Sequence, residues 1–259
     1  GLSPRVHPAV RYLNSDFTFT DDSDVEGVTQ AFAVAHAKYR DLFDTTPIIN
    51  SRERRQIQGD FDISPLDILA GRTYPDTVTT ASSNFDTHGF IIHPLFLVAP
   101  PNHDPLQAHI PFRCLLPKAV EGMLVTGLGM SAHRDALPVL RMQADVQNQG
   151  FAAGWAAAMS AADGSPLRRL DIRALQRRLI EAGILAPEVI SHSDSFPMRG
   201  DAIRNAAAGP LAALMPAALL LAHPDLSRPL LRAILATDPD GARRLDAALI
   251  LGMMGDPAA

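Results

Sequence analysis

The segment from Gly122 to Asp135 holds the residue pattern most able to bind a nucleotide. In "GMLVTGLGMSAHRD" an apolar run ends in GLGMSA, residues 127–132, which fits the pattern G-x-G-x-x-A. Where such a turn joins a strand to a helix, its glycines let backbone amides approach a pyrophosphate. The pattern therefore raises the hypothesis of a dinucleotide-binding loop.

The elements that would have to position this loop argue against that hypothesis. A primary dinucleotide loop is followed by a helix and then by a parallel strand with an acidic residue about 20 residues on. Asp145 lies at about this distance, but the sequence predicts that a helix begins near Arg141 and continues to Gly164. The next segment, 165–183, is again an amphipathic helix rather than a strand. We therefore reject the primary-loop interpretation.

Two arginines upstream could bind an anionic substrate. Arg52 and Arg54 alternate along a predicted extended segment, so they share a face, and Arg55 points the other way. Facing inward, they could bind a carboxylate. The sequence fits equally well an alternative in which both arginines lie on a solvent-exposed strand edge, paired with Glu53 and Asp60.

His88 is a candidate proton donor or acceptor, as is His93, because neutral imidazole titrates near physiological pH. Asp86 could orient one of these rings, although a histidine in a turn is more often structural. A metal site built from His88, His93, His103 and His109 matches no zinc spacing, so we expect no metal.

Composition excludes several classes of protein. The chain has 259 residues, a net charge of −5 and no Lys/Arg stripe interleaved with aromatics, which argues against a nucleic-acid partner. No apolar run reaches the roughly 18 residues of a membrane helix. The single cysteine, Cys114, excludes an internal disulfide and leaves the compartment open between cytoplasm and periplasm. The chain starts with Gly1, so we expect a processed subunit or part of a longer protein.

Start and stop signals predict the positions of several helices and strands. Ser23 to Glu26 form a capping box for a helix that continues to about Phe43. Ser64 and Pro65 predict the start of a short helix that Gly71 ends. Segments 109–118 and 122–127 predict two buried strands.

The predicted helix 141–164 is rich in small residues. A glycine inside a helix costs ~1 kcal/mol relative to alanine, so two of them suggest a packing reason. We expect Phe151 and Trp155 in the core, and a small-residue face packed closely against a sheet. That face consists of Gly150, Ala153, Gly154 and Ala157.

Beyond Pro187 the chain is rich in alanine, leucine and arginine. "AALLLAHPD" at 217–225 recurs loosely as "AALILGMMGDP" at 247–257. The 30-residue offset predicts a HEAT-like pair of helices, although chance similarity between Ala/Leu helices is about as good an explanation.

Segment 109–161, "HIPFRCLLPKAVEGMLVTGLGMSAHRDALPVLRMQADVQNQGFAAGWAAAMSA", resembles the C-terminal signature of the FAD-dependent oxidoreductase family. "SRERRQIQGDFDISPLDILAGRTYPD" at 51–76 resembles the Arg-rich strand and following helix of that family, and "FDTHG" at 85–89 resembles its DIHG turn. The match runs in order from about residue 45 to 185. The chain departs from the family at Leu128, where the family has Arg, at 133–135, where it has Thr-His-Glu, and at 142–145.

The resemblance implies an α/β (α+β) fold that corresponds to the C-terminal portion of a flavoprotein, followed by an all-helical tail. We predict a substrate or cap region at 1–108, the C-terminal part of the FAD-binding domain at 109–186, and the HEAT-like tail at 187–259. The N-terminal βαβ unit with its G-x-G-x-x-G loop is not found in this sequence. An N-terminal flavoprotein half, on the same or a separate chain, is therefore an expected partner, and the tail offers a surface for another protein.

The resemblance also implies FAD as cofactor and hydride transfer from a small organic substrate, with His88, Arg54 and Arg52 as catalytic candidates. A helix N-terminus aimed at the flavin would stabilise the negative charge near N1 and O2 of the reduced ring. Asp145 by itself fits a helix N-cap. The alternative is a non-catalytic helical scaffold derived from a flavoprotein. The predicted cofactor contacts are Gly127, Leu128, Gly129, Arg141, Gln143, Ala144, Asp145 and Val146.

Overall fold

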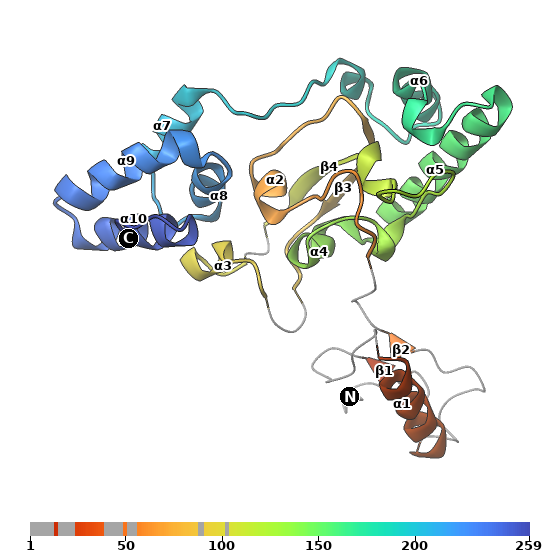
Figure 1. Ribbon diagram of the computed structural model, residues 1–259, viewed down its shortest axis with the longest axis horizontal. Coiled ribbons are helices and arrows are strands. Elements are labelled where there is room, and N and C mark those ends of the chain that lie inside the picture. Colours follow the sequence, from red (N-terminus) through yellow and green to blue (C-terminus); the bar gives the residue numbers. More distant parts are fainter. Residues whose placement is uncertain (1–12, 15–23, 39–48, 51–55, 88–90, 102–103) are drawn as a thin grey trace. The chain divides into compact units, whose positions relative to one another are not determined.

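A computed structural model describes residues 13–14, 24–38, 49–50, 56–87, 91–101 and 104–259 (Figure 1). These residues fall into two compact units. The first comprises Gly1–Gln56 and His88–Phe90, and the second comprises Ile57–Thr87 and Ile91–Ala259. The boundaries at 108 and 186 that the sequence suggests stay predictions.

The first unit holds the helix α1 (Val25–Lys38) and two short strands, β1 (Leu13–Asn14) and β2 (Ile49–Asn50), which pair in parallel. The amide of Glu26 donates a hydrogen bond of 3.1 Å to Oδ1 of Asp24 at the start of α1. The predicted capping residue Ser23, the helix end near Phe43, and the catalytic candidates Arg52, Arg54 and His88 lie outside the described residues.

The second unit is built on an antiparallel pair of strands, β3 (Thr77–Ser83) and β4 (Leu106–Pro111). Their register runs from Ser83 opposite Leu106 to Thr77 opposite Pro111, and Val78 and Ile110 are fully buried. The predicted strand 109–118 was too long. It ends at Pro111, which has no amide proton for the ladder, and a 3₁₀ turn η2 (Phe112–Leu115) follows.

The predicted short helix is confirmed as α2 (Pro65–Leu69). Ser64 is its N-cap, and Asp67 completes a capping box: Oδ2 of Asp67 accepts from the Ser64 amide at 2.8 Å, and the Asp67 amide donates to Ser64 Oγ at 3.3 Å. Gly71 follows with φ of 62°, a conformation that favours glycine.

The predicted strand 122–127 does not form. Within the described residues, this segment makes a single backbone hydrogen bond to another element, from the Val125 amide to the Leu115 carbonyl at 2.9 Å. A strand needs a repeating ladder of such bonds. Gly122 and Gly127 have φ of 72° and 65°, which bend the chain at both ends, and a 3₁₀ turn η3 (Gly127–Gly129) follows.

The predicted helix 141–164 is confirmed as α5 (Gln143–Asp163), ended by Gly164 at φ of 66°. The predicted packing was wrong. Residues Gln149, Ala152 and Ala156 form the buried face, which packs against β3. The other face, with Gly150, Gly154 and Ala157, is exposed, and Phe151 and Trp155 are 42% and 38% exposed rather than in the core. These two rings fall on the side of α5 that β3 does not cover.

The remaining elements connect the sheet to a helical C-terminal region. They include η4 (Arg134–Ala136), α4 (Leu137–Leu140), η5 (Leu167–Arg169), α6 (Ile172–Glu181) and η6 (Pro187–Ser191). The tail contains α7 (Gly200–Ala208), α8 (Leu214–Ala222), α9 (Pro224–Thr237) and α10 (Gly241–Met253). In this unit α8 packs against α2 and against α3 (Leu95–Val98), and α9 packs against α10. A helical tail is therefore observed (Figure 1), whereas its HEAT-like repeat stays a prediction.

Within the described part of the chain, no helix is both long and apolar enough to cross a bilayer. The same residues contain no cluster of three or more histidine, cysteine or carboxylate side chains that could hold a metal ion. Cys114 is fully buried, and this burial raises the pKa of its thiol.

Candidate functional site

The turn η3 lies against the first turns of α5. The Gly127 amide donates to Oε1 of Gln149 at 2.9 Å, and Nε2 of Gln149 donates to the Leu140 carbonyl at 3.1 Å. A Cβ added to Gly127 would lie 3.2 Å from Cγ1 of Val146. The positive φ and the close approach both explain a glycine here. The Gly127 amide already donates a hydrogen bond within the chain. The backbone of the turn lies near the start of α5.

Leu128 and Gly129, the other two residues of this turn, are half-buried. The Gly129 carbonyl accepts from the Ile57 amide at 2.9 Å, which ties the turn to the segment that leads into α2. The predicted contacts at 127–129 and 143–146 are thus brought together at one end of α5.

The N-terminus of α5 has no side-chain cap. Its N-cap is Met142, which makes no side-chain capping hydrogen bond, and the first intrahelical bond runs from the Val146 amide to the Met142 carbonyl at 2.9 Å. Gln143 and Ala144 are exposed. The early amides of a helix lack intrahelical acceptors, and they carry the positive end of the helix dipole. A long helix therefore presents an exposed, uncapped N-terminus.

Asp145 is not the N-cap that the sequence suggested. It is the third residue of α5, and its Oδ2 accepts a hydrogen bond of 3.3 Å from the Ser82 amide on β3. Desolvation raises the pKa of Asp145 above its ordinary value, and the Ser82 amide partly offsets this effect. Its carboxylate thus joins α5 to the sheet edge.

Arg141 lies just before α5 and contacts the segment "FDTHG". Its Nη2 donates to the Asp86 carbonyl at 3.2 Å. A guanidinium near a helix N-terminus adds positive charge to the same region of the molecule.

A buried carboxylate that sequence reasoning overlooked organises the neighbouring loop. Both the Ile92 and His93 amides donate to Oδ2 of Asp135, at 2.8 and 2.7 Å, and Nη1 of Arg134 lies 3.1 Å from Oδ1. The His93 and His133 rings meet edge to face, with centroids 5.0 Å apart. Burial and the neighbouring His133 lower the pKa of His93 below its ordinary value. The departure from the family at 133–135 was the signal that could have pointed to this cluster.

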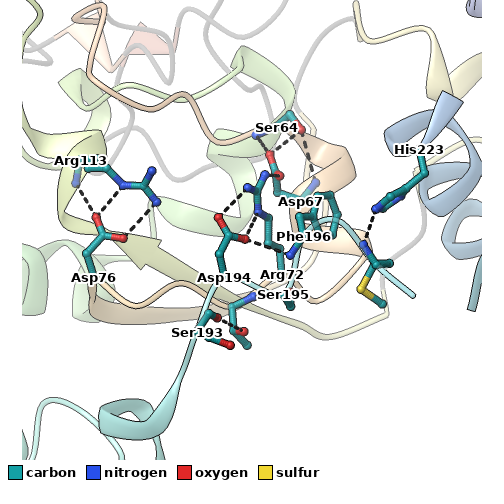
Figure 2. Close-up of polar contacts among 12 residues, drawn as sticks. Ser64, Asp67, Arg72, Asp76, Arg113, Ser193, Asp194, Ser195, Phe196 and His223 are labelled. Atoms are coloured by element: carbon teal, nitrogen blue, oxygen red, sulfur yellow. Dashed lines mark hydrogen bonds and ion pairs between the residues drawn. The ribbon is translucent and has the colours of Figure 1, made fainter. Parts of the chain in front are cut away.

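Figure 2 shows a second polar cluster around Arg72, which links α2 to the segment before the helical tail. Nη1 of Arg72 donates to Asp67 at 2.9 Å, and Nε and Nη2 donate to the two oxygens of Asp194, each at 2.9 Å. The guanidinium also lies 4.4 Å from the ring centroid of Phe196 and 5.1 Å from that of Tyr74. Burial alone would lower the pKa of Arg72, but these hydrogen bonds raise it above its ordinary value. We interpret this cluster as structural.

The described residues fit one edge of a flavin. The start of α5 has no side-chain cap, and its exposed residues Gln143 and Ala144 suit the electron-rich edge of the ring. Because Gly127 has no Cβ, the turn can lie close to them. With these features, the chain can direct the N-terminus of α5 at an anionic cofactor.

A comparison with protein families identifies the family of this chain. A model of the FAD dependent oxidoreductase family matches residues 10–179. The chain therefore belongs to this family, whose members depend on FAD. No curated protein and no solved structure matches the chain.

Proposed function

We propose that this chain forms the wall of a flavin site that faces the N1–O2 edge of the isoalloxazine ring, in an enzyme that oxidises or reduces a small organic molecule. Bound FAD supplies a hydride acceptor or donor for this reaction. The observation that carries the proposal is the uncapped, exposed N-terminus of α5, in a chain that belongs to an FAD-dependent family.

In this proposal the first residues of α5 act through the backbone. The amides of Gln143, Ala144 and Asp145 donate to the cofactor and stabilise negative charge that develops on it. Arg141 adds a positive charge next to them, and the Asp86 carbonyl orients its guanidinium. Because Asp145 accepts a bond from β3, its carboxylate is held by the sheet.

The turn at 127–129 has a positioning role. Gly127 lets the turn approach Val146, and Gln149 fixes the Gly127 amide, so Leu128 and Gly129 stay beside the helix start. We propose that their backbone lines the ribityl or pyrophosphate part of FAD. Leu128 stands where the family has arginine, so this chain contributes apolar contact rather than charge at that position.

We further propose that a βαβ unit with a Gly-rich loop packs on the exposed face of α5 and completes the site. Its support is twofold: no G-x-G-x-x-G loop occurs in the sequence, and α5 exposes Phe151 and Trp155 beside Gly150 and Gly154. No atom outside the local helix lies within 4 Å of a Cβ placed on either glycine, so a neighbour can approach the helix backbone closely. The catalytic roles of Arg52, Arg54 and His88 remain proposals of the sequence.

One observation favours the alternative, a non-catalytic scaffold. The Gly127 amide, which could have served a phosphate, donates to Gln149 instead. A chain that kept the flavoprotein shape without the cofactor would need no free donor at this turn.

The visible absorption spectrum separates the two functions. We would express the chain together with a βαβ segment from a family member, and measure FAD retained per chain after gel filtration. The enzyme proposal predicts a stoichiometric flavin spectrum that a hydride donor bleaches. A complex that assembles but retains no flavin would establish the scaffold instead.

A further inference from the structure

A cavity of about 290 Å³ lies where the segment around α2 and α3 meets the helical tail. Its walls come from five helices or their ends, and none of its lining residues belongs to the proposed flavin site. Six of the lining side chains are apolar: Leu66, Pro94, Leu221, Pro224, Met253 and Met254. Protein interiors are usually packed to near-crystal density, so an apolar opening of this size has room for a small ligand.

Two polar side chains, His93 and Arg228, also line this cavity. Nδ1 of His93 accepts from the Leu95 amide at 3.1 Å, so the neutral ring carries its proton on Nε2 and can donate from there. A mostly apolar pocket with a few polar groups of fixed orientation is the usual form of a small-molecule site.

Arg228 is incompletely satisfied within the described residues. Its Nη2 donates to the Met254 carbonyl at 2.8 Å, but its buried Nε has no hydrogen-bond acceptor there. Oδ2 of Asp256 lies 3.8 Å from that Nε, beyond hydrogen-bond distance. A guanidinium has five N–H donors, and the one hydrogen bond that Arg228 makes leaves terminal N–H groups from which an anion in the cavity can accept.

The charges around the cavity also favour an anion. Asp256 is shared between Arg228 and Arg232, and Arg232 makes the closer contact, with Nη2 2.9 Å from the carboxylate. Two guanidinium groups thus face one carboxylate, which leaves one positive charge at the edge of an apolar cavity.

We propose that this cavity binds a small carboxylate with an apolar body, such as a medium-chain acyl or aryl carboxylate. The carboxylate accepts hydrogen bonds from Arg228 and from Nε2 of His93, and the apolar part packs against Leu66, Leu221 and Met253. The site is independent of the proposed flavin function, since it uses other residues and other elements.

Isothermal titration with sodium octanoate, and with 1-octanol as a neutral analogue, tests this proposal on the chain as it stands. We expect octanoate to bind at one site, about tenfold or more tightly than octanol, because charge-assisted hydrogen bonds are the stronger ones. Arg228→Gln should weaken octanoate binding about tenfold and leave octanol unchanged. Leu221→Trp should fill the cavity and abolish the binding of both compounds.

Arg199→Gln is the matched control, because Arg199 pairs with Asp201 at an exposed site and does not line the cavity. Its octanoate affinity should stay within about twofold of the unmodified chain. The proposal is overturned if octanoate shows no saturable binding, if octanol binds equally well, or if Arg199→Gln weakens binding as much as Arg228→Gln does. If thermal unfolding shows that Arg228→Gln does not fold, the octanoate–octanol comparison and Leu221→Trp still decide the question.

Discussion

A negative charge introduced at the start of α5 should have opposite effects on the stability of the chain and on its affinity for flavin. Ala144 is exposed and is the second residue of this uncapped helix. In Ala144→Asp, the new carboxylate interacts favourably with the positive helix end by about 0.3–1 kcal/mol. For a chain of this length that raises the midpoint of thermal unfolding by about 1–3 °C.

The same charge weakens flavin binding if the cofactor faces these amides. It repels the electron-rich edge of the ring by about 0.7–2 kcal/mol, which lowers FAD affinity about threefold to thirtyfold. The assay is fluorescence titration of FAD into the chain co-expressed with a βαβ segment from a family member, alongside a thermal melt of each variant.

Ala233→Asp is the matched control, an equal charge change at an exposed alanine of α9, outside the proposed interface on α5. It should leave FAD affinity unchanged and should not stabilise the chain. Equal FAD affinities for the two variants would refute the proposed position of the flavin. A fall in the stability of Ala144→Asp would refute the dipole argument itself.

Three further predictions concern the stability of the fold. Gly127→Ala should destabilise the chain by about 1–2 kcal/mol more than Gly71→Ala in urea unfolding. Both glycines have positive φ, but only at Gly127 does the new Cβ meet a side chain, Val146, at 3.2 Å. Equal losses of stability in the two variants would contradict the close-packing role of Gly127. Arg72→Met should lower the free energy of unfolding by about 2–3 kcal/mol, since it leaves two carboxylates without an ion pair. Arg199→Met, at an exposed ion pair, should change this free energy little. Similar melting midpoints for the two variants would contradict this account. Burial and the neighbouring His192 lower the pKa of His109, so the unfolded chain binds the proton more tightly: the stability from neutral His109 is present above about pH 6.5 and is lost as pH falls below it. His109→Gln should therefore reduce the fall of the melting midpoint below pH 6.5, and an unchanged pH profile would show that this ring does not contribute.

Local signals predicted the helices that begin and end with recognisable residues. Ser64, Pro65 and Gly71 defined α2, and Gly164 and Gly183 ended α5 and α6, because caps and positive-φ turns depend on a few neighbouring residues. The family, and with it FAD, was likewise predicted from ordered motifs and is confirmed by the match to residues 10–179.

Features that depend on distant parts of the chain were not predictable. Segment 122–127 is apolar enough for a strand, yet strand formation requires a partner, and the sequence does not show which segments lie beside it. The buried face of α5 was misassigned because small residues fit both a tight interface and an exposed surface. Asp135 and Asp194 were missed because their partners, at residues 92–93 and 72, lie far away in the sequence.

Hydrogen exchange at the start of α5 tests the central claim most directly. In the chain co-expressed with a βαβ segment, peptides that cover residues 141–147 should exchange more slowly when FAD is bound, since the amides of Gln143 to Asp145 then gain an acceptor. Peptides from the middle of α9, far in sequence from this turn, should not change. Unaltered exchange at 141–147 in a protein with bound FAD would show that the cofactor lies elsewhere.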